Sequence, residues 1–457
     1  MSAKNAAAVD LGKTRLDEGL ASGLLKKGAG VAALCLVLCG FLSFFYRDDA
    51  LQRFFTSYLI CFAFFTTMTL GGLFFVILQH LVKAGWSVTV RRVAEGIMMN
   101  TRFLPILLIP VLIGISQGDL HPDVTGGHGG EHGDVAAAGH GEEAGHGEEA
   151  GHVEEAGHVE EDGHADAGHA AAPGEIAITH AVMDPLKQWW LGHGFMCLRM
   201  VICALIWWLL ARFYFANSVS QDATKDVAVT NRLQWWAPIC MMLYAATSSI
   251  FGLDLLMALD PHWYSTIWGI YFFAGSFLSF LAFLSITLLV LQWSGYLGDA
   301  VSAEHYHDVG KFMLAFVVFW SYIAFSQFML IWYGNIPEET IWFMKRQSNG
   351  WGYIGAWLIL GHFVIPFFFL MSRHVKRTKW MLLVGAAWVL GIHYVDLFWI
   401  VMPQNSPNTV PLPLLDLFLF LGVGAIYVGL TARNLDSLNL IPTGDPRLKE
   451  ALVHENY

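Results

Sequence analysis

Charged residues are scarce in this sequence. Asp, Glu, Lys and Arg make up 14% of the 457 residues, against about 25% in an ordinary soluble domain. This scarcity excludes a disordered chain, a nucleic-acid-binding protein and an ordinary soluble enzyme, because each of these needs a charged or polar surface. Hydrophobic residues, which make up 55% of the chain, take the place of the missing charge.

Cysteine and the common cofactor motifs are scarce or absent as well. The six Cys all lie in apolar runs without a C-x-x-C pair, which excludes a disulfide scaffold and argues against thiolate metal sites. The sequence contains no C-x-x-C-H, no phosphate-binding loop, no H-E-x-x-H and no dinucleotide fingerprint. Only His362 and His393 could form a mid-membrane pair of haem ligands. We therefore predict that this chain itself binds no metal, haem, iron–sulfur cluster or flavin.

Long hydrophobic runs, in contrast, are abundant. Crossing a membrane takes about 20 mostly apolar residues, and ten stretches qualify: 29–46, 54–79, 96–115, 189–212, 235–259, 264–293, 311–333, 351–372, 380–402 and 412–432. The sequence therefore predicts an all-α, polytopic membrane protein of ten transmembrane helices. The predicted segments are a tail (1–28), helices 1–3 (29–115), a long loop (116–188), helices 4–10 (189–432) and a second tail (433–457).

The positive charges predict an orientation. Of the Lys and Arg residues, 19 fall in the two tails and the loops on their side, and five fall on the opposite side. Because Lys and Arg gather in cytoplasmic loops, we expect both termini to be cytoplasmic and the long loop to be periplasmic.

The long loop is a low-complexity insert. Residues 119–175 hold 15 Asp and Glu and no Lys or Arg, and His recurs every six residues from His140 to His164. Such a segment cannot bury a core. One interpretation is a metal-collecting or proton-buffering brush, since His and carboxylates suit Zn, Cu or Ni. The other is a tolerated repeat expansion that is merely soluble.

Ionisable residues gather in the predicted outer half of the bundle. Asp254 lies near the outer end of helix 5, and His393 and Asp396 lie one turn apart on one face of helix 9. Charged groups at membrane depth are costly, so they are functional candidates by default. The alternatives are a structural ion pair between Asp254 and Arg199, and a core pair of His393 with Asp396.

A second polar group lies at the cytoplasmic start of helix 7, and a stripe continues along that helix. Residues 304–311 read EHYHDVGK, with His305, His307 and Asp308 among them. Tyr322 and Ser326 follow at helical spacing. The alternative interpretation of residues 304–311 is a solvated helix start. The alternative for Tyr322 and Ser326 is that they form hydrogen bonds between helices.

A break on helix 8 adds one further polar position. His362 lies four residues before Pro366, whose ring displaces the carbonyl of residue 362 from its helix bond. A freed carbonyl beside an imidazole can hold a water. Taken together, these positions suggest a proton path, which needs titratable groups linked by waters. Its candidate members are His305, His307, Asp308, Tyr322, Ser326, Asp254, His393 and Asp396.

Four stretches carry a family resemblance. They read DLLMALDPHWYSTIWGIY (254–271), EHYHDVGK (304–311), WSYIAFSQ with LIWYGNIPEET (320–327 and 330–340), and HYVDLFW followed by Pro403 (393–399). Together they resemble the ActF subunit of bacterial alternative complex III, a quinol:electron-acceptor oxidoreductase. The resemblance covers roughly residues 25–435 and leaves out the His/Glu loop.

The resemblance implies an NrfD/PsrC-like fold of two four-helix bundles plus two peripheral helices, in the bacterial cytoplasmic membrane. It implies a paralogous quinol-binding membrane subunit as partner, together with iron–sulfur and c-type cytochrome subunits, lipid, and a terminal oxidase among the electron acceptors. Menaquinol is then the substrate of the complex, and haem c and iron–sulfur clusters belong to the partners. This chain is expected to lack redox centres and to carry a proton path. Asp254, Asp260 and His262 are the quinone-binding candidates.

Two other functions fit the same sequence. A secondary transporter would bind its substrate at mid-membrane between repeats that contain broken helices, and Pro366 is one such break without a visible counterpart. A purely structural scaffold within the same complex is the third interpretation.

Overall fold

The computed structural model describes residues 9–43, 50–121 and 184–455. The predicted His/Glu loop falls almost entirely outside the described residues. The described residues form an all-α protein, as predicted. Its helices are α1 (Leu20–Ser43), α2 (Ala50–Leu81), α3 (Val88–Met98), α4 (Leu104–Gln117), α5 (Pro185–Leu191), α6 (His193–Thr224), α7 (Val227–Leu255), α8 (Trp268–Trp293), α9 (Ala303–Gly334), α10 (Pro337–Lys345), α11 (Trp351–Leu358), α12 (Ile365–Met371), α13 (Arg373–Arg377), α14 (Lys379–Asn405), α15 (Leu414–Leu435) and α16 (Leu448–Leu452).

The structure agrees with a polytopic protein of nine to ten spans. Among the described residues, nine helical stretches are long and apolar enough to cross a membrane. The pair α3–α4, bent by 44° at its break, brings the number to ten if it counts as one span. The chain is therefore a polytopic membrane protein.

The span boundaries differ from the predicted ones mainly at polar helix ends. The first helix begins at Leu20 instead of residue 29, and α6 continues to Thr224 instead of ending at residue 212. The predicted start of that span, at 189, belongs to the separate helix α5, because Gly192 has an extended backbone. A hydropathy window stops where charges begin, whereas the helix continues beyond the apolar run.

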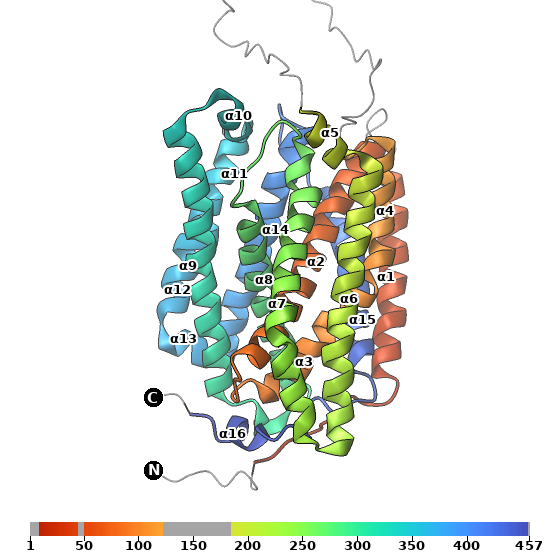
Figure 1. Ribbon diagram of the computed structural model, residues 1–457, viewed down its shortest axis with the longest axis vertical. Helices are drawn as coiled ribbons and strands as arrows, with labels where there is room; N and C mark the ends of the chain where they lie inside the picture. Colours follow the sequence, from red (N-terminus) through yellow and green to blue (C-terminus); the bar gives the residue numbers. More distant parts are fainter. Residues whose placement is uncertain (1–8, 44–49, 122–183, 456–457) are drawn as a thin grey trace, which may run out of the picture.

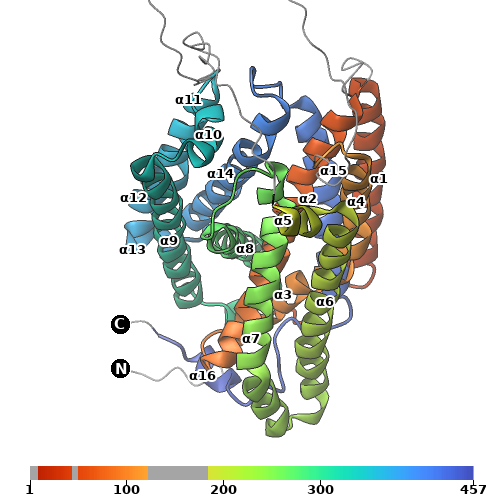
Figure 2. The same ribbon diagram turned by 45° about the horizontal axis from the view of Figure 1, so that its top comes forward.

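The helices form two adjoining four-helix groups. In the first, α2, α4, α6 and α7 contact one another in a closed ring. In the second, α8, α9, the broken helix α11–α12 and α14 do the same. Helices α1 and α15 pair outside both groups, with α15 packed on α2 (Figures 1 and 2). This arrangement agrees with the two bundles and two peripheral helices that the resemblance implies.

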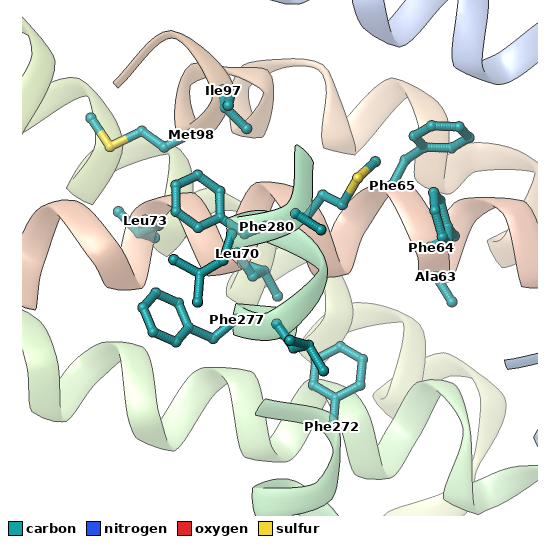
Figure 3. Packing of buried hydrophobic residues seen from close by; sticks show 14 of the residues in the cluster. Ala63, Phe64, Phe65, Leu70, Leu73, Ile97, Met98, Phe272, Phe277 and Phe280 are labelled. Atoms are coloured by element: carbon teal, nitrogen blue, oxygen red, sulfur yellow. The ribbon is translucent and has the colours of Figure 1, made fainter. Parts of the chain in front are cut away.

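Helix α2 is the centre of the molecule. It contacts α7, α8, α14 and α15, and nearly all of its apolar window is buried. Gly71 allows the closest approach, because a Cβ there would lie 2.3 Å from the carbonyl oxygen of Ser276 on α8. Phe277 and Phe280 of α8 pack against α2 at this crossing (Figure 3). The two bundles are therefore joined through the α2–α8 contact.

The two ends of the molecule differ. Helix α16 lies at one end, and α5 and α10 lie at the other (Figure 1); we call these the α16 end and the α5 end. At the α16 end, Lys13 forms a β-bridge with Tyr296, and Leu440 N–H donates to the carbonyl of Thr14 at 2.7 Å. The segments before α1 and after α15 therefore meet at one end, as an even number of spans requires.

A buried ion-pair network fastens the segment after α15 to the bundle. Arg91 pairs with Asp445 and Arg92 lies 3.0 Å from Glu95, while Asp222 lies 2.9 Å from Arg92. The approach is close enough that a Cβ on the neighbouring Gly444 would meet the carbonyl of Gln221 at 1.9 Å. The C-terminal segment is thus an integral part of the fold.

We expect Asp445 to make stability depend on pH in acid. Burial raises the pKa of Asp445, but the guanidinium groups of Arg91 and Arg447 outweigh it and lower that pKa to about 2. A carboxyl with a depressed folded-state pKa stabilises fully above its unfolded value and loses that contribution as pH falls through 2; the amount is about 2 kcal/mol. The apparent Tm of the detergent-solubilised protein, measured from pH 6 to pH 2, tests this.

The Tm advantage of the wild type over Asp445→Asn should shrink between pH 4 and pH 2. Asp436→Asn is the matched control, because Asp436 pairs with a half-exposed Arg433 at 3.3 Å and such pairs contribute little. An equal pH dependence in the wild type and Asp445→Asn would contradict the prediction.

Candidate functional site

One cluster of buried titratable side chains in the second bundle consists of His362, His393 and Asp396, which we call the buried triad. One ligand atom from each side chain lies within 4.8 Å of the other two, and all three residues are buried. His393 and Asp396 come from one face of α14, as their spacing predicts. His362 comes from the broken helix α11–α12. The sequence analysis paired His393 with Asp396, named His362 only as a possible second haem ligand with His393, and predicted no metal for this chain.

A π-helical turn positions His362. Residues Ile359–Val364 form this turn between α11 and α12, and Pro366 is the second residue of α12. Proline cannot donate the next helix hydrogen bond, and single π turns often mark functional sites in helices. The imidazole of His362 stacks on the indole of Trp320 of α9, with ring centroids 3.6 Å apart and planes within 15°. The ring plane of His362 is thereby fixed.

The other two members of the triad are held by α2 and α8. The Nε2 atom of His393 lies 3.1 Å from the hydroxyl of Thr67, and the hydroxyl of Tyr271 donates to Asp396. A cavity of about 10 Å³, close to the space of one water-sized sphere, is lined by Thr67, Tyr271, His393 and Asp396 among others. His393 and Asp396 thus border a small, mainly apolar cavity at the junction of α2, α8 and α14, and His362 does not line it.

The second group lies at the α5 end. Arg199 makes two hydrogen bonds to Asp254, at 2.9 and 2.7 Å, and stacks on Trp190 at 4.0 Å. This is the structural ion pair that we considered as the alternative role for Asp254. His121 donates to the carbonyl of Asp254 at 3.1 Å, and burial lowers the pKa of His121 to about 4, so this imidazole is neutral at pH 7.

The quinone-binding candidates are divided between different partners. Asp254 belongs to Arg199, whereas Asp260 lies 3.2 Å from Lys345 of α10. His262 is exposed. The structure therefore brings Asp254 together with His121, which sequence reasoning missed, and not with the two residues predicted beside it. Nothing in the local sequence marks His121 as buried.

The third group lies at the α16 end. His305 caps α9 by accepting from the backbone N–H of Ser302 at 3.2 Å. Asp308 lies 2.6 Å from His454 and 2.5 Å from Lys311. The rings of His305 and His454 are 5.6 Å apart. We define His305, Asp308 and His454 as the α16-end cluster, and His307 is buried beside it. The sequence analysis did not place His454 in this cluster, because it lies 146 residues after Asp308 in the chain.

Tyr322 and Ser326 do not join these groups. The side chain of Tyr322 is 66% exposed, and Ser326 is only partly buried. The buried face of α9 instead carries Trp320 and Gln327. Tyr322 and Ser326 keep the predicted helical spacing, and they lie on the outward face of α9, away from the three buried polar groups of this chain.

One more buried pair connects α2 to α15. Arg53 lies 2.5 Å from Asp416, and both side chains are buried. Most carboxylates at membrane depth are therefore matched by a cation, whereas Asp396 is hydrogen-bonded to a phenol and lies beside two imidazoles. The triad is thus the chemically distinctive site in the described part of the chain. No protein-family model and no curated protein matches this sequence.

Proposed function

We propose that this protein is a membrane subunit of a quinol:electron-acceptor oxidoreductase, pairing with a paralogous quinol-oxidising subunit. The observation that carries the proposal is the helix arrangement: two closed four-helix rings joined through α2 and α8, with α1 and α15 outside them. This is the architecture that the resemblance to ActF subunits of alternative complex III implies. The proposed partners supply the iron–sulfur clusters and c-type haems, and menaquinol is the proposed substrate of the complex.

We extend the proposal to a proton path entered from the α16 end. The 19-to-5 distribution of Lys and Arg assigns that end to the cytoplasm. Asp308 there is buried, lies within hydrogen-bond distance of His454, and has Lys311 beside it. A carboxylate in contact with an imidazole at a membrane–water boundary can accept protons from the cytoplasm and pass them inward. The contacts of Asp308 with His454 and Lys311 support this proposed role as a proton entry site.

A scaffold without a proton path is the second candidate function. The specific observation in its favour is the pairing of Asp254 with Arg199 and of Asp416 with Arg53. A guanidinium beside a carboxylate favours the charged form of that carboxylate over the protonated form that a proton relay needs. These pairs suit a rigid frame that positions a redox partner.

The test has two stages. A tagged chain purified from its native membranes should bring down proteins with the absorbance of c-type haem; isolation without haem or iron–sulfur partners would contradict the proposal and favour a transporter. The complex is then placed in liposomes, and protons moved per electron are compared between the wild type and Asp308→Asn. A lower ratio at near-normal quinol oxidation supports the proton path, and an unchanged ratio supports the scaffold. Asp436→Asn, at an exposed pair of the same end, is the control.

A further inference from the structure

The buried triad has the composition of a transition-metal site. Two imidazoles and one carboxylate are ligands that Zn²⁺ and Fe²⁺ share. The ligand atoms lie within 4.8 Å of one another, and each side chain is at most 2% exposed. Three ligating side chains from two different spans converge on one point, so the arrangement is a product of the fold and not of a local helix pattern.

The hydrogen bonds fix the tautomer of His393. The hydroxyl of Thr67 donates to the carbonyl of Phe64 at 2.7 Å, so its oxygen accepts from His393 Nε2–H at 3.1 Å. The proton of the neutral ring is therefore on Nε2, and Nδ1 keeps its lone pair. Metal-binding His residues commonly donate their second ring N–H to a supporting group in this way. Thr67 thus prepares Nδ1 of His393 as a ligand.

The available nitrogens have no competing partner. Nδ1 of His393 and both ring nitrogens of His362 lack a hydrogen-bond partner among the residues that the structure describes. A buried polar atom without a partner loses the hydrogen bond that it would make in water, which is unfavourable. The indole of Trp320 covers one face of the His362 ring. A cation between His362, His393 and Asp396 would take the lone pairs of His393 Nδ1 and of one His362 ring nitrogen, and only the remaining N–H of His362 would lack a partner among the described residues.

The surrounding backbone leaves room for this arrangement. Gly275 of α8 faces His393, and a Cβ at this position would lie 2.9 Å from Cε1 of the imidazole. Tyr271 donates to Asp396, which orients the carboxylate. The adjoining cavity of about 10 Å³ has space for one water-sized ligand. Tetrahedral Zn²⁺ with three protein ligands takes a water as its fourth.

We propose that the buried triad is a Zn²⁺ site, with Nδ1 of His393, one ring nitrogen of His362 and a carboxylate oxygen of Asp396 as ligands. Mg²⁺ and Ca²⁺ prefer oxygen ligands, and Cu⁺ prefers sulfur. The cation also offsets the negative charge of Asp396, which has no cationic ion-pair partner among the described residues. The inference goes beyond the proposed function and does not depend on it.

The test compares the zinc content of full-length variants. The His-rich loop also contains metal-type side chains, but it is identical in every variant, so its contribution cancels in the difference. After dialysis against Zn²⁺ and then buffer, His362→Gln and Asp396→Asn should each retain one Zn²⁺ per chain less than the wild type, as measured by mass spectrometry of the metal. Co²⁺ loading should give tetrahedral absorption bands that both variants lose.

His80→Gln is the matched control. His80 is equally buried, both of its ring nitrogens lack a partner among the described residues, and it stacks on Tyr214 at 5.3 Å. The His80→Gln variant should retain as much Zn²⁺ as the wild type. Zn²⁺ should also raise the Tm of the wild type and of His80→Gln but not of His362→Gln. Equal zinc contents in all four proteins, or a Tm shift that persists in His362→Gln, would overturn the proposal.

Discussion

Arg92→Ala is expected to destabilise the protein by about 3 kcal/mol, because it removes one of the two cations beside the buried Glu95, the other being Arg91 at 3.4 Å, together with the cation beside Asp222. Arg92 is fully buried, lies 3.0 Å from Glu95 and 2.9 Å from Asp222, and donates to the carbonyl of Ser218 at 3.1 Å. Glu95 is also fully buried. The loss should appear as a low yield of folded protein and a low Tm in detergent.

A double variant distinguishes the stability lost with the ion pair from the stability lost with the packing of the Arg92 side chain. Replacing both partners of a buried ion pair costs far less than removing one, so Arg92→Met with Glu95→Gln should recover a large part of the stability. Arg433→Ala is the control, because the Arg433–Asp436 pair is half-exposed and is worth at most about 1 kcal/mol. If Arg92→Ala and Arg433→Ala lower Tm equally, the buried ion pairs of Arg92 contribute no more to stability than a half-exposed pair does.

The spans could be predicted from the sequence because their signal is local. A run of about 20 apolar residues identifies a span whatever its neighbours are. The spacing of His393 and Asp396 likewise placed both on one face of α14. Their third partner, His362, could not be assigned to them, because no sequence spacing states which two spans touch. Pro366 was the available signal, since it marked the break from which the π turn arises.

Which side of a membrane-spanning helix packs against the rest of the chain was harder to predict from the sequence. A soluble helix shows which side is buried, because its exposed side is polar. On α9 the exposed side carries Tyr322 and Phe325 and the buried side carries Val317 and Trp320, so both faces are apolar and the period alone does not choose between them. The ion-pair partners of the buried charged residues could not be predicted from the sequence either. Neither Arg53 for Asp416 nor His454 for Asp308 could be found without distances between helices.

Arg346→Met is expected to destabilise the α5 end by about 3 kcal/mol, since hydrogen bonds to charged groups are worth about 1.5–3 kcal/mol each. Pro403 lies inside α14, and its ring removes the helix hydrogen bond of the carbonyl four residues earlier, on Trp399. Arg346 replaces that bond by donating from Nε to the Trp399 carbonyl at 3.1 Å. Its other nitrogens donate to the carbonyls of Ile400 and Trp342.

The shape of the guanidinium, and not its charge alone, explains this role. Arg346 also lies flat on the indole of Trp342, 3.5 Å from the ring centroid, so one planar group serves three carbonyls and a ring. An ammonium group is a point charge on a flexible stem and cannot do the same. Arg346→Lys should therefore recover less than half of the Tm lost in Arg346→Met. Lys345→Met, at a partly exposed pair with Asp260, should lower Tm much less. A wild-type Tm in Arg346→Lys would show that charge alone is sufficient and that Pro403 needs no planar partner.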